Sequence, residues 1–196
     1  MRIMFVGRDR GTQDAVSVAL KSPNLIIDEA RSLDDAVGQA QMYDYETILV
    51  DTTSMGPSGF TFIRAIRERK IGSPVLVLSR EGNVQTKVRA FELGADDYVL
   101  IPFDAEELLA RVYAVIRRSK GFSQPVLQLG PLHLDIGKNE ALVDGRKVNL
   151  TGKEYSILEL LVLHRGNAIS KESFLNHLYS GLDEPEAKII DVFICK

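Results

Sequence analysis

The side chains in this sequence that could do chemistry stand just after short apolar runs. Asp9, Asp51 and Ser79 each follow such a run directly or within three residues. A carboxylate or hydroxyl in such a place can take part in group transfer, but it can equally complete a turn. Asp51 and Ser79 are therefore candidate site residues, with an ordinary turn or loop role as the alternative.

Other kinds of chemistry lack the residues that they need. Cys195 is the single cysteine, which excludes an internal disulfide. The three histidines, His133, His164 and His177, share no metal-ligand spacing with it. The sequence contains no Gly-rich phosphate loop, no nucleophile with a paired base and no metal triad. These absences argue against an enzyme and against a structural metal site.

Composition and charge are those of an ordinary globular protein. Hydrophobic residues make up 45% and charged residues 26% of the 196. No apolar run approaches the ~20 residues of a membrane helix, and the apolar stretch at the N-terminus is too short for a secretion signal. We expect a cytoplasmic protein with no membrane partner. The net charge is -3, and residues 119–196 hold nine Lys and Arg against ten Asp and Glu, so DNA binding must be judged from pattern.

Five short apolar runs alternate with helical patterns in residues 1–118. The runs are rich in Val, Ile and Leu and are continuous, as in strands buried on both faces. They span residues 3–6, 25–27, 48–50, 75–78 and 98–101. This order predicts an α/β fold, a flavodoxin-like (βα)5 doubly wound parallel sheet. Ligand sites in such sheets lie at the carboxyl ends of the strands, which directs attention to residues 7–9, 51–54, 79–80 and 101–102.

The pattern changes after residue 118. Residues 119–125 contain Gly, Ser and Pro and are predicted to be a linker. Four short strand-like segments follow, at 126–129, 132–134, 141–143 and 147–150. Capping patterns at Thr151–Glu154 and Ser170–Ser173 then open two helices, and a third helical pattern begins at residue 189. We predict a first domain at 1–118 and a second at 126–196.

These features resemble the OmpR/PhoB family of response regulators along essentially the whole chain. The segments that carry the resemblance are Gly94–Tyr98, Arg117–Gly121, Leu150–Tyr155, Phe174–Tyr179, Asp183–Glu186 and Lys188–Lys196. The resemblance implies a receiver domain followed by a winged helix-turn-helix domain. It also implies a DNA-binding transcriptional regulator of two-component type, with a sensor kinase or phosphotransferase as a possible input.

The resemblance assigns roles to three residues of the receiver pocket. Asp51 matches the position of the family's phosphoacceptor, and Ser79 matches the small hydroxyl that senses the phosphate. Tyr98 matches the aromatic switch residue at the head of the last strand. The loop after Asp51 departs from the family, because its proline stands at Pro57 and not at the position of Met55.

The rest of the pocket lacks the residues that phosphoryl transfer needs. Gly7 and Arg8 stand where the family places two adjacent metal-binding carboxylates, and Ile101 replaces its lysine. Asp9 lies one position beyond the carboxylate pair. Mg²⁺ prefers carboxylate and water oxygens, so Asp9 and Asp51 would form at best a weakened metal site. We therefore expect no required cofactor.

Arg8 offers a replacement for the lost cations. A guanidinium binds a carboxylate bidentately and is permanently charged. We hypothesise that Arg8 pairs with Asp51 and holds the domain in one state without phosphate. The alternative is that Arg8 is a solvated loop residue.

The residues that match the family's dimer face keep every charge. In the family three ion pairs cross a two-fold axis through the fourth and fifth helices and the strand between them. The matching pairs here are Lys87 with Glu107, Asp96 with Arg118, and Asp97 with Arg111. A solvated face is the alternative, since single surface pairs are weak. The six charges together favour a homodimer that forms without phosphorylation.

The second domain matches a winged helix-turn-helix whose third helix enters the major groove of double-stranded DNA. Lys188 and Lys196 are candidate phosphate contacts, or solvated lysines, and the Gly181–Glu186 loop is a possible contact for RNA polymerase. The apolar residues expected in its core are Leu158, Leu161, Phe174, Leu175 and Ile190. The sequence ends inside the third helix, which favours a fragment of a longer protein.

Two functions follow from these patterns. The leading one is a DNA-binding transcriptional regulator of response-regulator type that dimerises through its receiver and is controlled atypically or independently of phosphorylation. The alternative is an interaction protein that does not bind DNA but heterodimerises with a related regulator and antagonises it.

Overall fold

A computed structural model describes residues 1–21, 25–124, 126–179 and 185–195 of the chain. The chain divides into two compact units, one of residues 2–119 and one of Met1 with the chain from Lys120 onward. Lys196 and residues 181–184 of the predicted polymerase loop lie outside the described residues.

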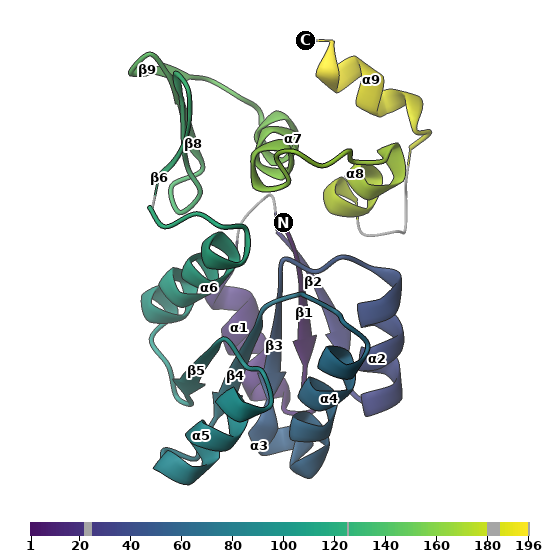
Figure 1. The fold of residues 1–196 in the computed structure, drawn as a ribbon, viewed down its shortest axis with the longest axis vertical. Coiled ribbons are helices and arrows are strands. Elements are labelled where there is room, and N and C mark those ends of the chain that lie inside the picture. Colours follow the sequence, from purple (N-terminus) through teal and green to yellow (C-terminus); the bar gives the residue numbers. More distant parts are fainter. Residues whose placement is uncertain (22–24, 125, 180–184, 196) are drawn as a thin grey trace. The chain divides into compact units, whose positions relative to one another are not determined.

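The first unit alternates strands and helices as predicted. Its elements are β1 (Arg2–Val6), α1 (Arg10–Ala19), β2 (Ile26–Ala30), α2 (Leu33–Met42), β3 (Thr47–Asp51), α3 (Thr52–Met55), α4 (Pro57–Glu68), β4 (Val75–Ser79), α5 (Val84–Glu92), β5 (Asp97–Leu100) and α6 (Ala105–Ser119). The strands form one parallel sheet in the order β2-β1-β3-β4-β5. The predicted doubly wound sheet is confirmed (Figure 1).

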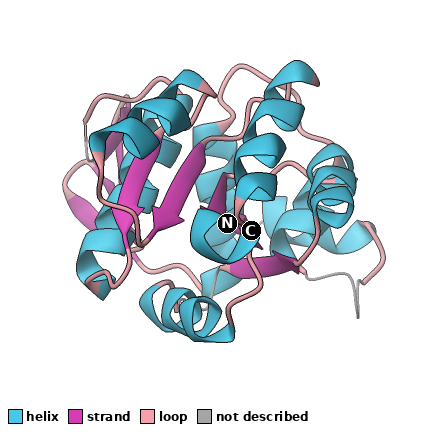
Figure 2. Ribbon diagram, turned by 90° about the horizontal axis from the view of Figure 1, so that it is seen from below, coloured by secondary structure: helices cyan, strands magenta, loops and turns pink. Residues whose placement is uncertain are grey.

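Helices cover both faces of this sheet. Helix α1 packs with α6 on one face, and α2 packs with α4 on the other. Figure 2 shows the strands enclosed between helices. Every residue of the three central strands, β1, β3 and β4, is buried. Burial on both faces explains why these strands are continuous apolar runs without polar alternation.

The second unit begins with a four-stranded antiparallel sheet in sequence order. Its strands are β6 (Val126–Leu129), β7 (Leu132–Asp135), β8 (Glu140–Val143) and β9 (Arg146–Val148). Asp144 and Gly145 join β8 to β9 with φ angles of 50° and 75°, as a two-residue hairpin turn requires. Strand β9 ends two residues earlier than predicted, because Asn149 and Leu150 lead into the helix cap at Thr151.

Three helices complete the second unit, α7 (Gly152–Leu163), α8 (Lys171–Leu178) and α9 (Lys188–Ile194). The capping box at Thr151 and Glu154 is present, and Ser170 caps α8. Phe174, Leu175 and Ile190 lie in the core as predicted. Leu161 was expected there but is 41% exposed, because it lines a surface groove with residues of α9. No helix in the described part of the chain has the length and apolarity to cross a membrane.

Candidate functional site

The candidate residues of the first unit meet at the carboxyl edge of the sheet. Val6 pairs in register with Val50, Asp51 with Leu78, and Ser79 with Leu100. Gly7, Asp51, Ser79 and Ile101 therefore end or directly follow four adjacent parallel strands. This edge is the usual place for a ligand site in a doubly wound sheet.

Asp51 uses one carboxylate oxygen to cap helix α3. Its Oδ1 accepts hydrogen bonds from the backbone N–H groups of Thr53 at 3.0 Å and Ser54 at 3.1 Å. The side chain is 1% exposed. Its Oδ2 is buried and has no hydrogen-bond partner among the described residues. Asp51 therefore acts as a helix N-cap, and the oxygen left for chemistry is closed to solvent.

Arg8 does not pair with Asp51, so this hypothesis was wrong. The Arg8 Nε donates to the backbone oxygen of Arg31 at 2.9 Å. Gly7 N also donates to Ala30 O at 3.0 Å, which extends the pairing between β1 and β2 into this loop. Strands β2 and β3 flank β1 on opposite sides. The Arg8 side chain therefore extends toward the end of β2 and away from Asp51.

Gly7 stands where no side chain fits. A Cβ added at Gly7 would lie 2.6 Å from Cζ of Phe5 and 3.1 Å from Cβ of Asp51. Phe5 is 1% exposed and cannot move aside without disturbing the core. The Phe5 ring thus occupies the space that a carboxylate at position 7 would need.

Asp9 is engaged by helix α1. Its Oδ2 accepts from the backbone N–H of Thr12 at 3.1 Å and from the Thr12 hydroxyl at 2.7 Å. These hydrogen bonds, with the nearby Arg80 guanidinium, lower the pKa of Asp9. The Arg80 Nη2 lies 3.5 Å from the same oxygen. The Asp9 carboxylate therefore serves as a second helix cap.

The residues at this edge do not fit a Mg²⁺ ion, which receiver domains normally use at the phosphorylation site. Gly7 supplies no ligand, Arg8 supplies a cation, and Asp9 is bound to Thr12. Among the described residues no group of three or more His, Cys, Asp and Glu could hold a metal. Ile101 also offers no charge to a phosphate, and its backbone N–H donates to Ser79 O at 2.8 Å.

Ser79 and Tyr98 both contact Glu81 in the loop after β4. The buried Ser79 hydroxyl accepts from the Glu81 N–H at 3.2 Å. The Tyr98 hydroxyl donates to the Glu81 carbonyl at 2.7 Å. Burial raises the pKa of Tyr98, whose ring lies inside the unit. The two predicted switch residues are thus joined through one loop residue.

Two hydroxyls of the 51–54 stretch, to which the sequence analysis gave no role of their own, also act at this edge. Thr53 Oγ1 accepts from the Arg80 N–H at 2.8 Å, and Ser54 Oγ accepts from the Arg8 N–H at 2.9 Å. Their position directly after Asp51 is a signal for local bonds of Ser and Thr to the backbone. Ser54 makes such a local bond, from its hydroxyl to the Asp51 carbonyl at 3.5 Å. The N–H groups that the two hydroxyls accept from lie 27 and 46 residues away, and only the fold reveals them.

The charges of the predicted dimer face lie on α5, on β5 and the residue before it, and on α6. Arg111 binds two of them within the chain, Asp97 Oδ2 at 3.0 Å and Glu107 Oε1 at 2.8 Å. Lys87 Nζ lies 5.9 Å from the centre of the Tyr98 ring. Arg118 Nε donates to the carbonyl of Ala114. In the single chain, therefore, Asp97 and Arg111 already form the pair that was predicted across a two-fold axis.

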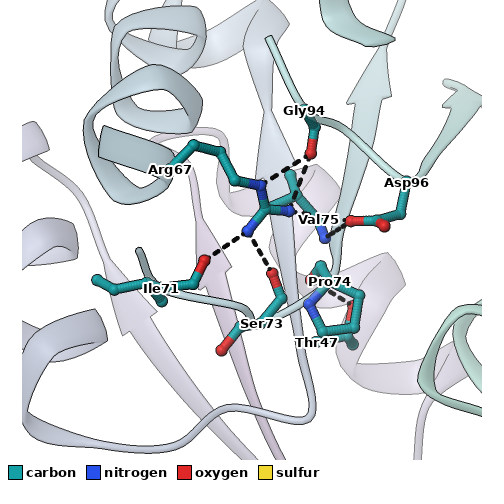
Figure 3. A network of polar contacts seen from close by, with 8 residues as sticks. All are labelled: Thr47, Arg67, Ile71, Ser73, Pro74, Val75, Gly94 and Asp96. Atoms are coloured by element: carbon teal, nitrogen blue, oxygen red, sulfur yellow. Dashed lines mark hydrogen bonds and ion pairs between the residues drawn. The ribbon is translucent and has the colours of Figure 1, made fainter. Parts of the chain in front are cut away.

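Asp96 belongs to an internal network around Arg67 (Figure 3). Its Oδ2 accepts from the Val75 N–H at 2.8 Å and from Arg67 Nη2 at 3.0 Å. Arg67 also donates to the carbonyls of Gly94, Ile71 and Ser73. Sequence reasoning missed Arg67, which ties the loop before β4 to the loop before β5.

Helix α5 presents an apolar stripe beside these charges. Val84, Val88 and Phe91 are 70%, 46% and 47% exposed. Their spacing of four and three residues places them on one face of the helix. Lys87 lies between them in the sequence, so apolar and charged side chains share this part of the surface.

The second unit places Lys188 at the exposed start of α9. Helix α8 contacts both α7 and α9, which is the arrangement of a helix-turn-helix. Lys171 Nζ joins α8 to α9 through Asp191 Oδ2 at 2.7 Å. Lys188, the lysine predicted to contact phosphate, therefore stands at the start of α9 and is not a member of the ion pair that joins α8 to α9.

Together the two units define a class of protein in which a flavodoxin-like α/β domain precedes a helix-turn-helix domain. Comparison with known families agrees. The family model of the response regulator receiver domain matches residues 3–113, and that of the transcriptional regulatory protein C-terminal domain matches residues 145–196. The chain belongs to the response regulators of OmpR/PhoB type, which are DNA-binding transcription factors and not enzymes.

Curated relatives extend the match over the full chain. The cell cycle transcriptional regulator CtrA of Caulobacter vibrioides is 43% identical over all 196 residues, which cover 85% of its length. The cell cycle response regulator CtrA of Brucella anthropi is 42% identical, with 84% of its length covered. The response regulator DrrB of Thermotoga maritima, an OmpR/PhoB homologue, has a solved structure that matches with a TM-score of 0.53 at 25% identity. That match covers 98% of this chain and 85% of DrrB.

Proposed function

We propose that this response regulator controls transcription without phosphorylation of its receiver domain. The observation that carries the proposal is the state of Asp51, whose Oδ1 caps α3 and whose Oδ2 is buried. A phosphoacceptor must present an oxygen to a phosphodonor, with a cation to neutralise the developing charge. Asp51 presents no oxygen to a phosphodonor. Gly7 and Arg8 stand in place of the two carboxylates that would bind the metal, and Ile101 stands in place of the lysine.

DNA recognition belongs to the second unit. We propose that α9 enters the major groove of double-stranded promoter DNA and that Lys188 contacts a phosphate near its start. Lys196 keeps the same proposed role but lies outside the described residues. The Gly181–Glu186 loop, most of which is also outside them, remains a proposed contact for RNA polymerase. A sensor kinase or phosphotransferase is not required in this scheme, nor is a metal cofactor.

Self-association would use α5, β5 and α6. These are the family's fourth and fifth helices with the strand between them, because the four-residue α3 adds one helix to the count here. The apolar stripe of Val84, Val88 and Phe91 supports this proposal, since its burial would favour association. The ion pair of Arg111 with Asp97 would change from within one chain to between two chains.

A second candidate function uses the same surface. The interface charges match those of the family, so a related regulator would meet the same complementary side chains as a second copy would. We keep heterodimerisation with such a regulator, and antagonism of it, as the alternative. Mixing the chain with a tagged relative and with its own tagged copy, and comparing the captured amounts, discriminates the two functions.

Intact-mass measurement tests the proposal directly. The protein is incubated with Mg²⁺ and a small phosphodonor beside its Asp51→Ala variant, with a receiver that retains both carboxylates and the lysine as the positive control. We expect the mass of a phosphoryl group on the control only. A phosphate-sized gain in this protein that disappears in Asp51→Ala would overturn the proposal.

A further inference from the structure

We infer that the hydroxyls of Thr53 and Ser54 hold the loops at the carboxyl edge together in place of a bound phosphoryl group, and that Thr53 is thereby a positioning residue for Tyr98. The inference rests on the proposed phosphate-independent function. It gives that function a physical cause, because it explains how the pocket keeps one arrangement without a ligand.

The two hydroxyls connect three loops that are distant in the sequence. Ser54 Oγ accepts from the N–H of Arg8 in the loop after β1. Thr53 Oγ1 accepts from the N–H of Arg80 in the loop after β4. Both residues belong to α3, which Asp51 caps directly after β3. The three loops that surround Asp51 are therefore joined by hydrogen bonds of 2.8 to 2.9 Å.

These bonds also use the donors that a phosphoryl group would need. Phosphoryl oxygens on an aspartate are bound by nearby backbone N–H groups and cations. Here the N–H groups of Thr53 and Ser54 donate to Asp51 Oδ1, and those of Arg8 and Arg80 donate to the two hydroxyls. Four backbone donors at this edge are thus satisfied by side chains of the protein itself.

The Thr53 contact leads directly to Tyr98. Arg80, which Thr53 holds, is followed by Glu81, whose N–H donates to Ser79 Oγ. The carbonyl of the same Glu81 accepts from the Tyr98 hydroxyl at 2.7 Å. Tyr98 is buried on β5, and Lys87 of α5 lies beside its ring. A loop held by Thr53 therefore keeps Tyr98 inside the unit, next to the proposed dimer face.

Ser54 differs from Thr53 in what it can influence. It joins the α3 helix to Arg8 in the loop after β1, and Arg8 in turn donates to Arg31 directly after β2. Asp9 of the same loop meets Arg80 at 3.5 Å through an exposed ion pair that does not involve the Ser54 hydroxyl. That side of the sheet is opposite to β4 and β5. Loss of the Ser54 hydroxyl should therefore loosen Arg8 and leave Tyr98 in place, which makes Ser54 an internal control.

Thr53→Val tests the inference, because valine keeps the shape of threonine and removes the acceptor. The readouts are hydrogen exchange of the Arg80 and Arg8 amides, and the ¹⁹F NMR signal of Tyr98 in fluorotyrosine-labelled protein, assigned with Tyr98→Phe. We expect Thr53→Val to raise exchange at Arg80 by roughly fivefold to tenfold, as loss of one ordinary hydrogen bond would, and to shift the Tyr98 signal. Thr53→Ser should behave like the wild type, and Ser54→Ala should raise exchange at Arg8 only.

Two results would overturn the inference. One is an unchanged Tyr98 signal in a folded Thr53→Val protein, and the other is a shift in Thr53→Ser as large as that in Thr53→Val. Thr53→Ala provides the same comparison if Thr53→Val does not fold. The readouts do not depend on phosphorylation, so uptake of phosphate by Asp51 would contradict the proposed function and leave the contact between Thr53 and Tyr98 to be judged by these signals.

Discussion

Asp51 has two possible roles, helix capping and phosphoryl acceptance, and they require different properties of its carboxylate. Capping α3 needs an acceptor for two backbone N–H groups, which either a carboxylate or an amide oxygen provides. Accepting a phosphoryl group needs an ionised oxygen within reach of a donor and a metal. Asparagine preserves the first role and abolishes the second, so substitution at this residue separates them.

We predict that Asp51→Asn unfolds at nearly the same urea concentration as the wild type, whereas Asp51→Ala loses about 1 kcal/mol of stability with its cap. Urea unfolding followed by circular dichroism measures both. DNA binding of Asp51→Asn should equal that of the wild type. Equal destabilisation of the two variants would show that the cap contributes little and that charge at Asp51 matters instead.

The close approach of Gly7 to Phe5 can also be tested by substitution, because the two residues should affect the free energy of unfolding together. A Cβ at Gly7 would overlap the Phe5 ring at 2.6 Å, and overpacking of a buried site costs about 1–3 kcal/mol. We predict that Gly7→Ala is destabilised by that amount and that Phe5→Leu combined with Gly7→Ala recovers part of the loss. A double-mutant cycle of unfolding free energies measures the coupling. Additive effects of the two substitutions would exclude the proposed overlap.

At the scale of elements, Arg67 of α4 fixes how β4 and β5 begin. Its guanidinium donates to three backbone carbonyls and to Asp96, which also accepts from the first N–H of β4. Carbonyls left without donors in a partly buried place are costly. The position of β5, and with it Tyr98 and the proposed dimer face, therefore depends on a side chain from a helix on one face of the sheet.

We predict that Arg67→Ala lowers the unfolding free energy by about 2–3 kcal/mol, because the group it loses donates several hydrogen bonds from a charged fork. Arg64→Ala is the matched control, since Arg64 is exposed on the same helix and should change stability by less than about 0.5 kcal/mol. Urea unfolding compares the two. A loss at Arg67 no larger than that at Arg64 would contradict the role given to the network.

How far the sequence predicts this structure depends on whether a feature is local. The continuous apolar runs of the central strands and the caps at Thr151 and Ser170 are local patterns, and the structure confirms both. The missing carboxylates at Gly7 and Arg8 were also readable, because an absent side chain needs no geometry. The direction of the Arg8 side chain was not, since it depends on which strand lies on each side of β1.

The contacts of Thr53, Ser54 and Arg67 escaped prediction for a related reason. Each joins segments that are 27 to 46 residues apart, and the residue types alone fit an exposed loop or helix equally well. The short helix α3 was also missed, because four residues carry no hydrophobic period. Leu161 shows a different limit of sequence patterns. Its helical spacing places it on an apolar face of α7, but the spacing does not tell which part of that face another element covers.

At the scale of the whole molecule, regulation without phosphate requires another source of free energy for association. The pair of Arg111 with Asp97 exists already within the chain, so its exchange between two chains leaves the number of ion pairs unchanged. The apolar stripe on α5 is different, because its burial removes exposed apolar surface from water. The stripe, and not the charges, should therefore supply most of the affinity, while the charges select the partner.

We predict that Val88→Asp with Phe91→Asp shifts the protein from dimer to monomer in sedimentation velocity, with at least about a tenfold rise in the dissociation constant. Met42→Asp is the matched control, because Met42 is as exposed as Val84 but is the last residue of α2, which packs with α4 and β2. The dimer constant should change little between 50 mM and 200 mM salt, whereas DNA affinity should fall steeply as phosphate contacts release counterions. A dimer that dissociates in salt as steeply as the DNA complex would instead assign the association energy to the six charges. A dimer that survives the double substitution would place the interface on another surface. The ion pair of Arg111 with Asp97 would then stay within one chain in the dimer as well.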